Sequence, residues 1–329
     1  KLKVGGFGEF WAGYADNDAA GNVNSNFDVK NDAEITFKGE ETLDNGMKVG
    51  VLFELEAGSG NDNAGGPGFD ESFAWVKASW GQLNIGNNDV ATGYTGGVSV
   101  VGPVGIIKSD AGDWIPGNGE LNNTDGDVGV GDAGNITYFT PRVAGFQAIV
   151  SYTPDSSDAA TSDFDDQETA GTHNVISGAL KYSGKFGGAK IGLSTGYTHA
   201  ELTDQAAGGE ATAEAWSVAG SVGVGKFKIT AAYAKENVAD IDEFWGVGVI
   251  YKMNKADTIS LGYGRGEESQ RGVGNGDREE KVITLGYERN MGKGVKVGAS
   301  LFKVSRSGDL TVAGGNDGMG FVTGLKLKF

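Results

Sequence analysis

Cysteine is absent from this sequence of 329 residues, and proline is scarce, with five residues. The lack of cysteine fits an exported bacterial protein that avoids oxidation chemistry. No apolar run approaches the 18 or more residues of a transmembrane helix, because the longest, at 98–107, is broken by Gly102, Pro103 and Gly105. The N-terminus has no basic, apolar and small-residue signal pattern, so we expect the mature form if the protein is exported. These absences exclude helical membrane spans.

Basic residues are in the minority, and histidine is nearly missing. Lys and Arg number 27 against 44 Asp and Glu, which gives a net charge of −17. Nucleic acid is therefore not an expected partner, because its binding needs basic patches. The two histidines, His173 and His199, lie at loop or strand edges without a G-x-S-x-G or H-E-x-x-H context. The sequence thus does not predict an enzyme.

Glycine and alternating side chains dominate what is present. Glycine accounts for 58 residues, well above the usual share of roughly 7%. Apolar and polar residues alternate in about sixteen segments of roughly 9–12 residues, the length of a strand that crosses an outer membrane at a tilt. Short connections such as 44–46 alternate with long polar ones such as 154–172. This order is typical of an up-and-down membrane barrel.

Tyrosine positions indicate which way the apolar faces point. Nine of the ten tyrosines share the apolar register, and Tyr94 is the exception. Most lie near strand ends, as interfacial aromatic belts require. The opposite faces carry glycine, serine, threonine and charge, as a wet lumen would. We therefore predict an all-β fold over residues 1–329: a single domain formed by a 16-stranded antiparallel transmembrane β-barrel.

One long segment, at about 88–134, interrupts the alternation. It is rich in glycine, carries seven acidic residues and has one lysine, Lys108. A loop this long inside a compact fold is usually functional. We expect it to fold into the barrel and narrow an aqueous pore, and we call it the constriction loop.

Several motifs, in order along the chain, resemble those of a known family. They are AEITFKGEETLDNGMKVGVLFELE at 33–56, SFAWVKASWGQLNIG at 72–86, NITYFTPRVAGFQAIVSY at 135–152, YKMNKADT at 251–258 and the terminal Phe329. The sequence resembles the trimeric general-diffusion porins of Gram-negative outer membranes, and GNND at 86–89 is similar to their α-proteobacterial branch. The resemblance implies a homotrimer whose third loop lies in the lumen, with acids facing a basic wall. Here the basic wall positions fall on Glu9, Glu34, Asn87 and Phe139, so we expect a cation-preferring pore.

The candidate site residues form three sets. The predicted constriction residues are Asp89, Asp110, Asp113, Trp114 and Glu120, with Trp114 expected to pack the loop against the wall. The predicted lumen wall comprises Glu9, Glu34, Lys38, Lys48, Glu54, Glu56, Lys77 and Asn87. Ca²⁺ could bind acidic loops through hard oxygen ligands, at Asp125, Asp127, Asp163 and Asp165. No cofactor is expected to be required.

The predicted function is that of an outer-membrane porin, an integral multi-pass β-barrel for passive diffusion of small hydrophilic solutes and ions. Its expected surroundings are outer-membrane lipid and lipopolysaccharide. Within channels, the alternative is a substrate-specific pore with an internal solute-binding site. Outside channels, the alternatives are an outer-membrane enzyme and a secreted acidic calcium-binding or adhesive β-protein. Small residues on the outward register (Gly6, Gly8, Ala12, Ala74 and Ala78) could mark the subunit contact.

Overall fold

The structure is a computed structural model. It describes residues 1–17, 26–57, 68–95, 100–105, 111, 114–115, 126, 128, 130–156, 171–204, 209–237, 241–269, 277–308 and 317–329. Among these residues, no helix is long and apolar enough to cross a membrane.

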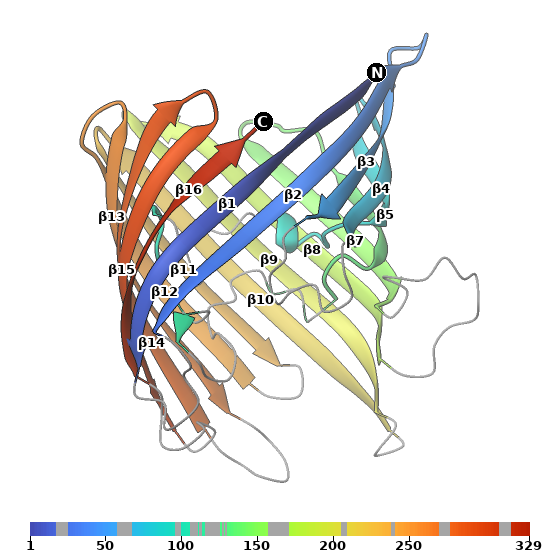
Figure 1. Cartoon of the computed structure of the whole chain (residues 1–329). Helices are drawn as coiled ribbons and strands as arrows, with labels where there is room; N and C mark the ends of the chain where they lie inside the picture. The colour runs from blue at the N-terminus through green and yellow to red at the C-terminus, as the bar shows by residue number, and fades with distance from the viewer. Residues whose placement is uncertain are drawn as a thin grey trace.

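Sixteen antiparallel strands form one closed barrel (Figure 1). They are β1 (Leu2–Asn17), β2 (Phe27–Thr42), β3 (Lys48–Glu56), β4 (Phe69–Ala78), β5 (Gly81–Asn87), β6 (Gly134–Phe139), β7 (Phe146–Asp155), β8 (Gly171–Phe186), β9 (Ala189–Asp204), β10 (Gly209–Val224), β11 (Phe227–Asn237), β12 (Ile241–Lys252), β13 (Asp257–Ser269), β14 (Asp277–Gly292), β15 (Val295–Ser307) and β16 (Gly318–Lys328). A single 3₁₀ turn, η1 (Gly93–Thr95), follows β5. The predicted strand number is confirmed. The strands are 6 to 16 residues long, so several exceed the predicted 9–12.

Every strand pairs with its neighbours in the chain, and the first strand pairs with the last. β1 and β16 align from Phe7↔Lys328 to Asn17↔Gly318. The Gly6 amide donates to the Phe329 carbonyl at 3.0 Å, and the Phe329 amide donates to the Gly6 carbonyl at 3.1 Å. The ring therefore leaves no strand edge unpaired, the condition that a sheet must meet inside a bilayer.

The two rims of the barrel differ in their connections. One rim carries short links such as 187–188 and 225–226 and also both chain ends, at the top of Figure 1; we call it the turn end. The other, the loop end, carries longer links such as that from β7 to β8. The predicted alternation of short and long connections holds for most of the barrel, but the loop-end links 205–208 and 238–240 are shorter than the turn-end link 140–145, so it is not strict.

The outer face is apolar, as the tyrosine register predicted. Leu261, Leu285 and Leu301 lie side by side on β13, β14 and β15 and are about half exposed. Aromatic pairs flank this band on both sides, with Phe227–Tyr251 towards the turn end and Trp216–Tyr233 towards the loop end, their ring centroids 4.7 and 4.9 Å apart. This arrangement matches a lipid-facing band between two aromatic girdles.

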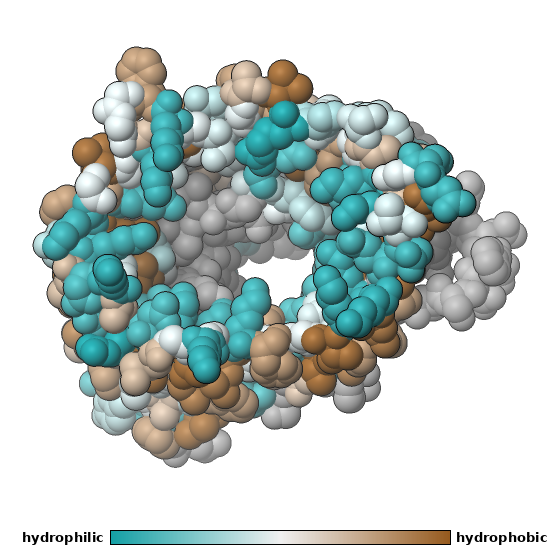
Figure 2. Space-filling model, turned by 90° about the horizontal axis from the view of Figure 1, so that it is seen from above, coloured by the Kyte–Doolittle hydropathy of each residue, from teal (hydrophilic) through white to brown (hydrophobic). Residues whose placement is uncertain are grey.

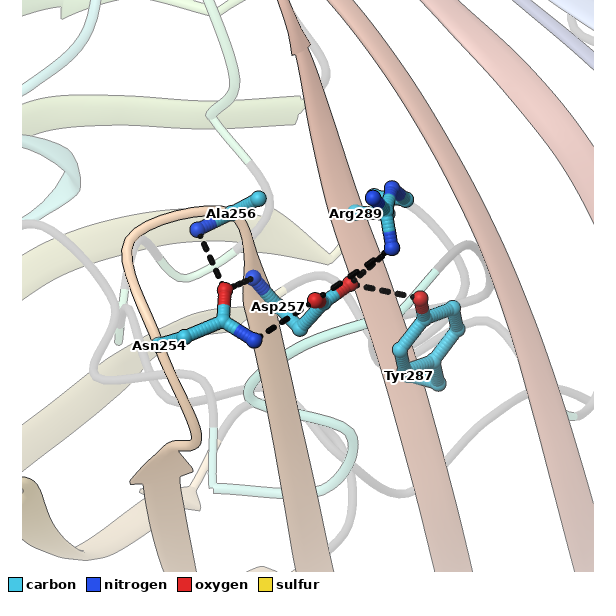
Figure 3. A network of polar contacts seen from close by, with 5 residues as sticks. All are labelled: Asn254, Ala256, Asp257, Tyr287 and Arg289. Atoms are coloured by element: carbon cyan, nitrogen blue, oxygen red, sulfur yellow. Dashed lines mark hydrogen bonds and ion pairs between the residues drawn. The ribbon is translucent and has the colours of Figure 1, made fainter.

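Polar groups appear at the turn end of the outer face. In the β12–β13 turn the Asn254 Oδ1 accepts from the Ala256 amide at 2.8 Å, and Asp257 accepts from the Tyr287 hydroxyl at 2.7 Å (Figure 3). Arg289 Nη1 lies 3.1 Å from the Asp257 carboxylate. The network lies where an aqueous interface would solvate it, and it joins the turn to β14.

β4, whose alternation is ambiguous in sequence, has a clear inward face. Trp75 is 7% exposed and, together with Phe73 and Lys77, lines a hollow on the lumen side. Val76 pairs with Val49 on the outer face. Phe73 and Trp75 thus fill part of the lumen instead of facing lipid, whereas Phe69 at the start of β4 packs against Phe53 of the outer face.

Candidate functional site: the lumen and its constriction loop

The constriction loop is fastened where it leaves and re-enters the sheet. Asn88 Nδ2 donates to Asn135 Oδ1 at 2.7 Å, and Asn84 Nδ2 donates to Asn88 Oδ1 at 3.1 Å. The Tyr94 hydroxyl also donates to Asn88 Oδ1, at 3.0 Å. Burial raises the pKa of Tyr94, so its hydroxyl stays protonated and remains a donor. This buried amide cluster ties the two ends of the loop together.

A second set of contacts holds the loop against β7, β8 and β9. The Ala91 amide donates to Ser151 Oγ at 2.8 Å, and the Thr92 amide donates to Ser177 Oγ at 3.1 Å. The Thr92 and Thr198 hydroxyls both donate to the Gly126 carbonyl, at 3.1 and 2.8 Å. Because Thr92 and Gly126 belong to the outgoing and returning arms of the loop, this cluster joins both arms to the wall.

The loop then reaches the other side of the barrel. The Val104 amide donates to Ser260 Oγ at 3.1 Å, and that hydroxyl donates to the Val104 carbonyl at 2.9 Å. Val100 and Val101 lie against Gly246 and Gly264, where an added Cβ would overlap their methyl groups. Glycines on β12 and β13 therefore form a groove for the loop backbone.

A fourth contact joins the loop to β1, β14 and β15. Trp114 is 7% exposed and packs over Gly13, with Lys30 Nζ 5.2 Å from its ring centroid. Arg306 Nη1 donates to the Ile115 carbonyl at 3.0 Å, and its Nε donates to Glu280 at 2.5 Å. The described residues of the loop therefore contact the inner face of the barrel at β1, at β7 to β10 and at β12 to β15. Trp114 packs the loop against the wall, as expected.

Part of the inner face is a packed interface, which the sequence interpretation missed. Loop residues Val90, Val128 and Val130 cover Ala213 and Ala215, which are fully buried. Predicting a uniformly wet lumen was wrong in this sector. The available signal is the run of small inward residues on β8 to β10, whose size allows a loop to pack closely.

Acidic side chains gather on the inner wall of β2 to β4, beside the start and end of the loop. We call them the acidic wall: Glu34, Glu54, Glu56 and Glu71 from the strands, with Asp89 and Asp132 from the loop. The carboxylates of Glu71, Asp89 and Asp132 approach within 4.8 Å of one another. Carboxylate oxygens are the type of ligand that hard cations such as Ca²⁺ prefer.

Glu9 differs from the other predicted wall acids. It is 1% exposed and forms an ion pair with Lys326 of β16. It therefore does not present a free carboxylate to the pore, and the expectation of acid at this position facing the loop is corrected. Phe139, another of the aligned positions, packs edge-on against Tyr94 with ring centroids 4.8 Å apart.

The predicted wall lysines lie on the inward register near the turn end. Lys48 forms an ion pair with Glu40 at 3.3 Å, and Lys38 Nζ lies 5.6 Å from the Trp75 ring centroid. Lys77 pairs in register with Lys48 and lines the same hollow. Asn87 ends β5 and pairs with Gly134.

The remaining candidates lie outside the described residues. They are the constriction acids Asp110, Asp113 and Glu120 and the calcium candidates Asp125, Asp127, Asp163 and Asp165. Both sets stay predictions.

Together, the closed lipid-facing barrel and the loop fastened across its lumen define a pore-type integral protein of the outer membrane. The sequence model of the Gram-negative porin family matches residues 1–309. The chain belongs to this family.

Several solved structures share the fold. The anion-selective porin from Comamonas acidovorans is 20% identical, with a TM-score of 0.72 and coverage of 100% of this chain and 99% of that one. OmpF of Salmonella typhi, in complex with daunomycin, is 17% identical, with a TM-score of 0.66 and coverage of 100% and 97%. The trimer form of OmpT of Vibrio cholerae is 12% identical, with a TM-score of 0.65 and coverage of 100% and 99%. A search of curated sequences returned no significant match.

Proposed function

We propose that this porin conducts small hydrophilic solutes and ions by passive diffusion, and that the constriction loop sets their size limit. The observation that carries the proposal is the loop itself, fastened to β7–β9, β13 and β15. Seen from the turn end, hydrophilic residues border a central opening on its right and lower sides, while hydrophobic ones lie along the outer side (Figure 2). Reconstitution into planar bilayers tests the proposal: stepwise conductance in chloride salts is expected, and its absence would refute a pore.

A cation preference is supported by the acidic wall. Glu54 lies beside Glu71, and Glu71 lies beside the loop acids Asp89 and Asp132. A cluster of one sign concentrates counter-ions in a narrow space. One protein of the same fold is described as anion-selective, so the fold alone does not decide the sign. Local charge must decide it.

Reversal potentials in a salt gradient measure this preference. The unmodified pore is expected to favour cations, and Glu54→Gln with Glu71→Gln should move the reversal potential towards zero. Glu214→Gln is the matched control, because Glu214 bonds with Tyr197 and His199 away from the lumen. Anion preference in the unmodified pore, or an equal shift in the control, would contradict the proposal.

A substrate-specific channel with an internal binding site is the second candidate. One observation favours it: a lysine-lined hollow on the inner wall at the turn end. Conductance blocked by one class of solute at micromolar to millimolar concentration would distinguish it from a general pore.

We also propose a homotrimer embedded in lipid and lipopolysaccharide. The outward faces of β1 and β4 offer small residues, including Gly8, Ala12 and Ala74, that would let backbones approach closely. Heat-sensitive, trimer-sized migration on gels tests the assembly, and copurified lipopolysaccharide would test the lipid contact.

Calcium at the acidic loops is optional in this proposal, so chelation should leave conductance unchanged. No catalytic activity is proposed. The two histidines, the candidate catalytic bases of the sequence, each lie 3.6 Å from a glutamate, His173 from Glu201 and His199 from Glu214.

A further inference from the structure

Three lysines lie in one hydrogen-bonded row across four strands at the turn end. Lys185 of β8 pairs with Lys190 of β9, which pairs with Gly223 of β10, which in turn pairs with Lys228 of β11. All three lysines lie on the inward register. Because Gly223 has no side chain, the row is open in its middle.

A hollow of about 810 Å³ occupies this opening. Its lining includes the three lysines together with Lys252 of β12, and Val104 of the constriction loop also lines it. One row further from the turns, Ser183 and Ser221 flank Gly192 and add hydroxyls to the lining. We call this space, formed by Lys185, Lys190, Lys228 and Lys252, the lysine hollow.

The charge of the lysine hollow is uncompensated among the described residues. None of its four lysines forms an ion pair with a carboxylate in the part of the chain that the structure describes. Glu288, the acid in the lining, already pairs with Lys296 at 2.9 Å. In the hollow across the lumen, one of the three lysines, Lys48, is paired with Glu40 at 3.3 Å.

The four lysines of the hollow and Lys226, which also lines it, repel one another unless anions neutralise them. A chloride ion touches one lysine at a time and gains only about 1 kcal/mol per contact in water. A small anion with several charges can contact two or three of these lysines at once, and the serine hydroxyls can donate to its oxygens. The hollow is therefore matched to multivalent oxyanions.

We propose that the lysine hollow is a binding site for small multivalent oxyanions, which enter it from the turn side of the pore. Short turns face the periplasm in outer-membrane barrels, so the site would be loaded from the periplasmic side. The inference rests on the proposed pore and deepens its second candidate by naming a solute class and a location.

The test uses the reconstituted full-length trimer and inorganic pyrophosphate, with citrate as a second probe that carries carboxylates. Each is added to one side of the bilayer at a time. The expected result is a conductance block by both, because several charge contacts form together. The block should be about tenfold more potent from the turn side, because the lysine hollow lies at that end of the pore. Raising the salt from about 0.1 M to 1 M should weaken the block, because the Debye length shortens from about 10 Å to 3 Å.

Two matched triple variants localise the site. Lys185→Gln, Lys190→Gln and Lys228→Gln should raise the half-blocking concentration of pyrophosphate about tenfold or more through lost Coulomb contacts. Lys38→Gln, Lys48→Gln and Lys77→Gln remove the same charge from the opposite wall and should change it by less than about threefold. Both variants must retain heat-modifiable migration and chloride conductance.

The outcomes separate the two levels of the proposal. Equal effects of the two triple variants, or equal block from both sides, would overturn the lysine hollow as a site. Chloride steps without block by either anion would also overturn it while leaving the pore intact. A lack of chloride steps in the unmodified protein would refute the pore itself.

Discussion

Arg306 is a single side chain that connects the barrel wall to the constriction loop. Its guanidinium bonds with Glu280 of the neighbouring strand and with the Ile115 carbonyl of the loop. The Arg306 and Glu280 side chains are 3% and 2% exposed. Because the pair is buried away from water, each charge is stabilised mainly by the other.

Arg306→Met should therefore be strongly destabilising. The substitution leaves the buried Glu280 carboxylate without its ion-pair partner. Removing one partner of a buried pair typically costs about 3–5 kcal/mol. Equilibrium unfolding in lipid vesicles measures the loss. The double variant Arg306→Met with Glu280→Met should recover much of it, because replacing both partners leaves no unpaired charge. Equal stability of the single and double variants would show that the pair is not coupled.

The position of an individual side chain could be predicted only where the two-residue alternation of a strand separates inward from outward residues. Alternation alone placed Lys38, Glu54 and Lys77 on the inner face, and the structure has them on that register. It could not show that Lys326, more than 300 positions away in the chain, covers Glu9. That contact depends on where the barrel closes, which no local pattern encodes.

Among the structural elements, the constriction loop owes its position to glycines of the barrel wall, which lie outside the loop itself. At Gly286 of β14, an added Cβ would overlap the carbonyl oxygen of Val104. The loop backbone thus lies directly on the β14 wall at this position. Only a residue without a side chain permits so close an approach.

Gly286→Ala should displace the loop from β14 towards the lumen. The expected result is a lower and noisier single-channel conductance in planar bilayers, because the loop loses its seat on the wall. Gly178→Ala is the matched control, since an added Cβ there meets nothing within 4 Å. Identical channels from both variants would mean that this contact does not position the loop.

Strands were predictable from sequence, while the path of the loop was not. A strand is recognisable by its alternation of apolar and polar residues, because one face contacts lipid and the other faces the lumen. The loop has no such two-sided environment. It packs against the glycines of β12–β14 and the alanines of β10. In the sequence these positions are recognisable only as small residues.

At the scale of the whole molecule, the outer surface must match the bilayer. Leu285 lies in the apolar row between Leu261 and Leu301. Leu285→Arg would place a charge in this band, at a cost of about 2–4 kcal/mol if the row lies at the bilayer midplane.

Met291→Arg provides the comparison, because Met291 is exposed at the turn end, two residues from Arg289. Its expected cost is about 0–1 kcal/mol, as for charges near the interface. Unfolding free energies in vesicles of fixed thickness test the pair. A soluble barrel with a packed interior would tolerate both changes equally in water, so equal costs would argue against the assigned lipid face.

Charge is distributed along the pore axis and not only across it. The acidic wall lies beside the constriction loop, whereas the lysine hollow lies at the turn end. The net charge of −17 predicted the sign of the first region but concealed the second. A sum over the chain cannot show how charges of opposite sign separate in space.

The pairing of β1 with β16 has a consequence for biosynthesis. Of the sixteen barrel strands, the one that is synthesised first finds its second partner in the one that is synthesised last. Until that partner arrives, β1 and β15 both expose unpaired backbone groups, each of which would cost several kcal/mol in lipid. A truncated chain therefore has no stable halfway form in the membrane. The barrel can close in the membrane only when the eleven-residue strand β16, Gly318–Lys328, is present to pair with β1 and β15.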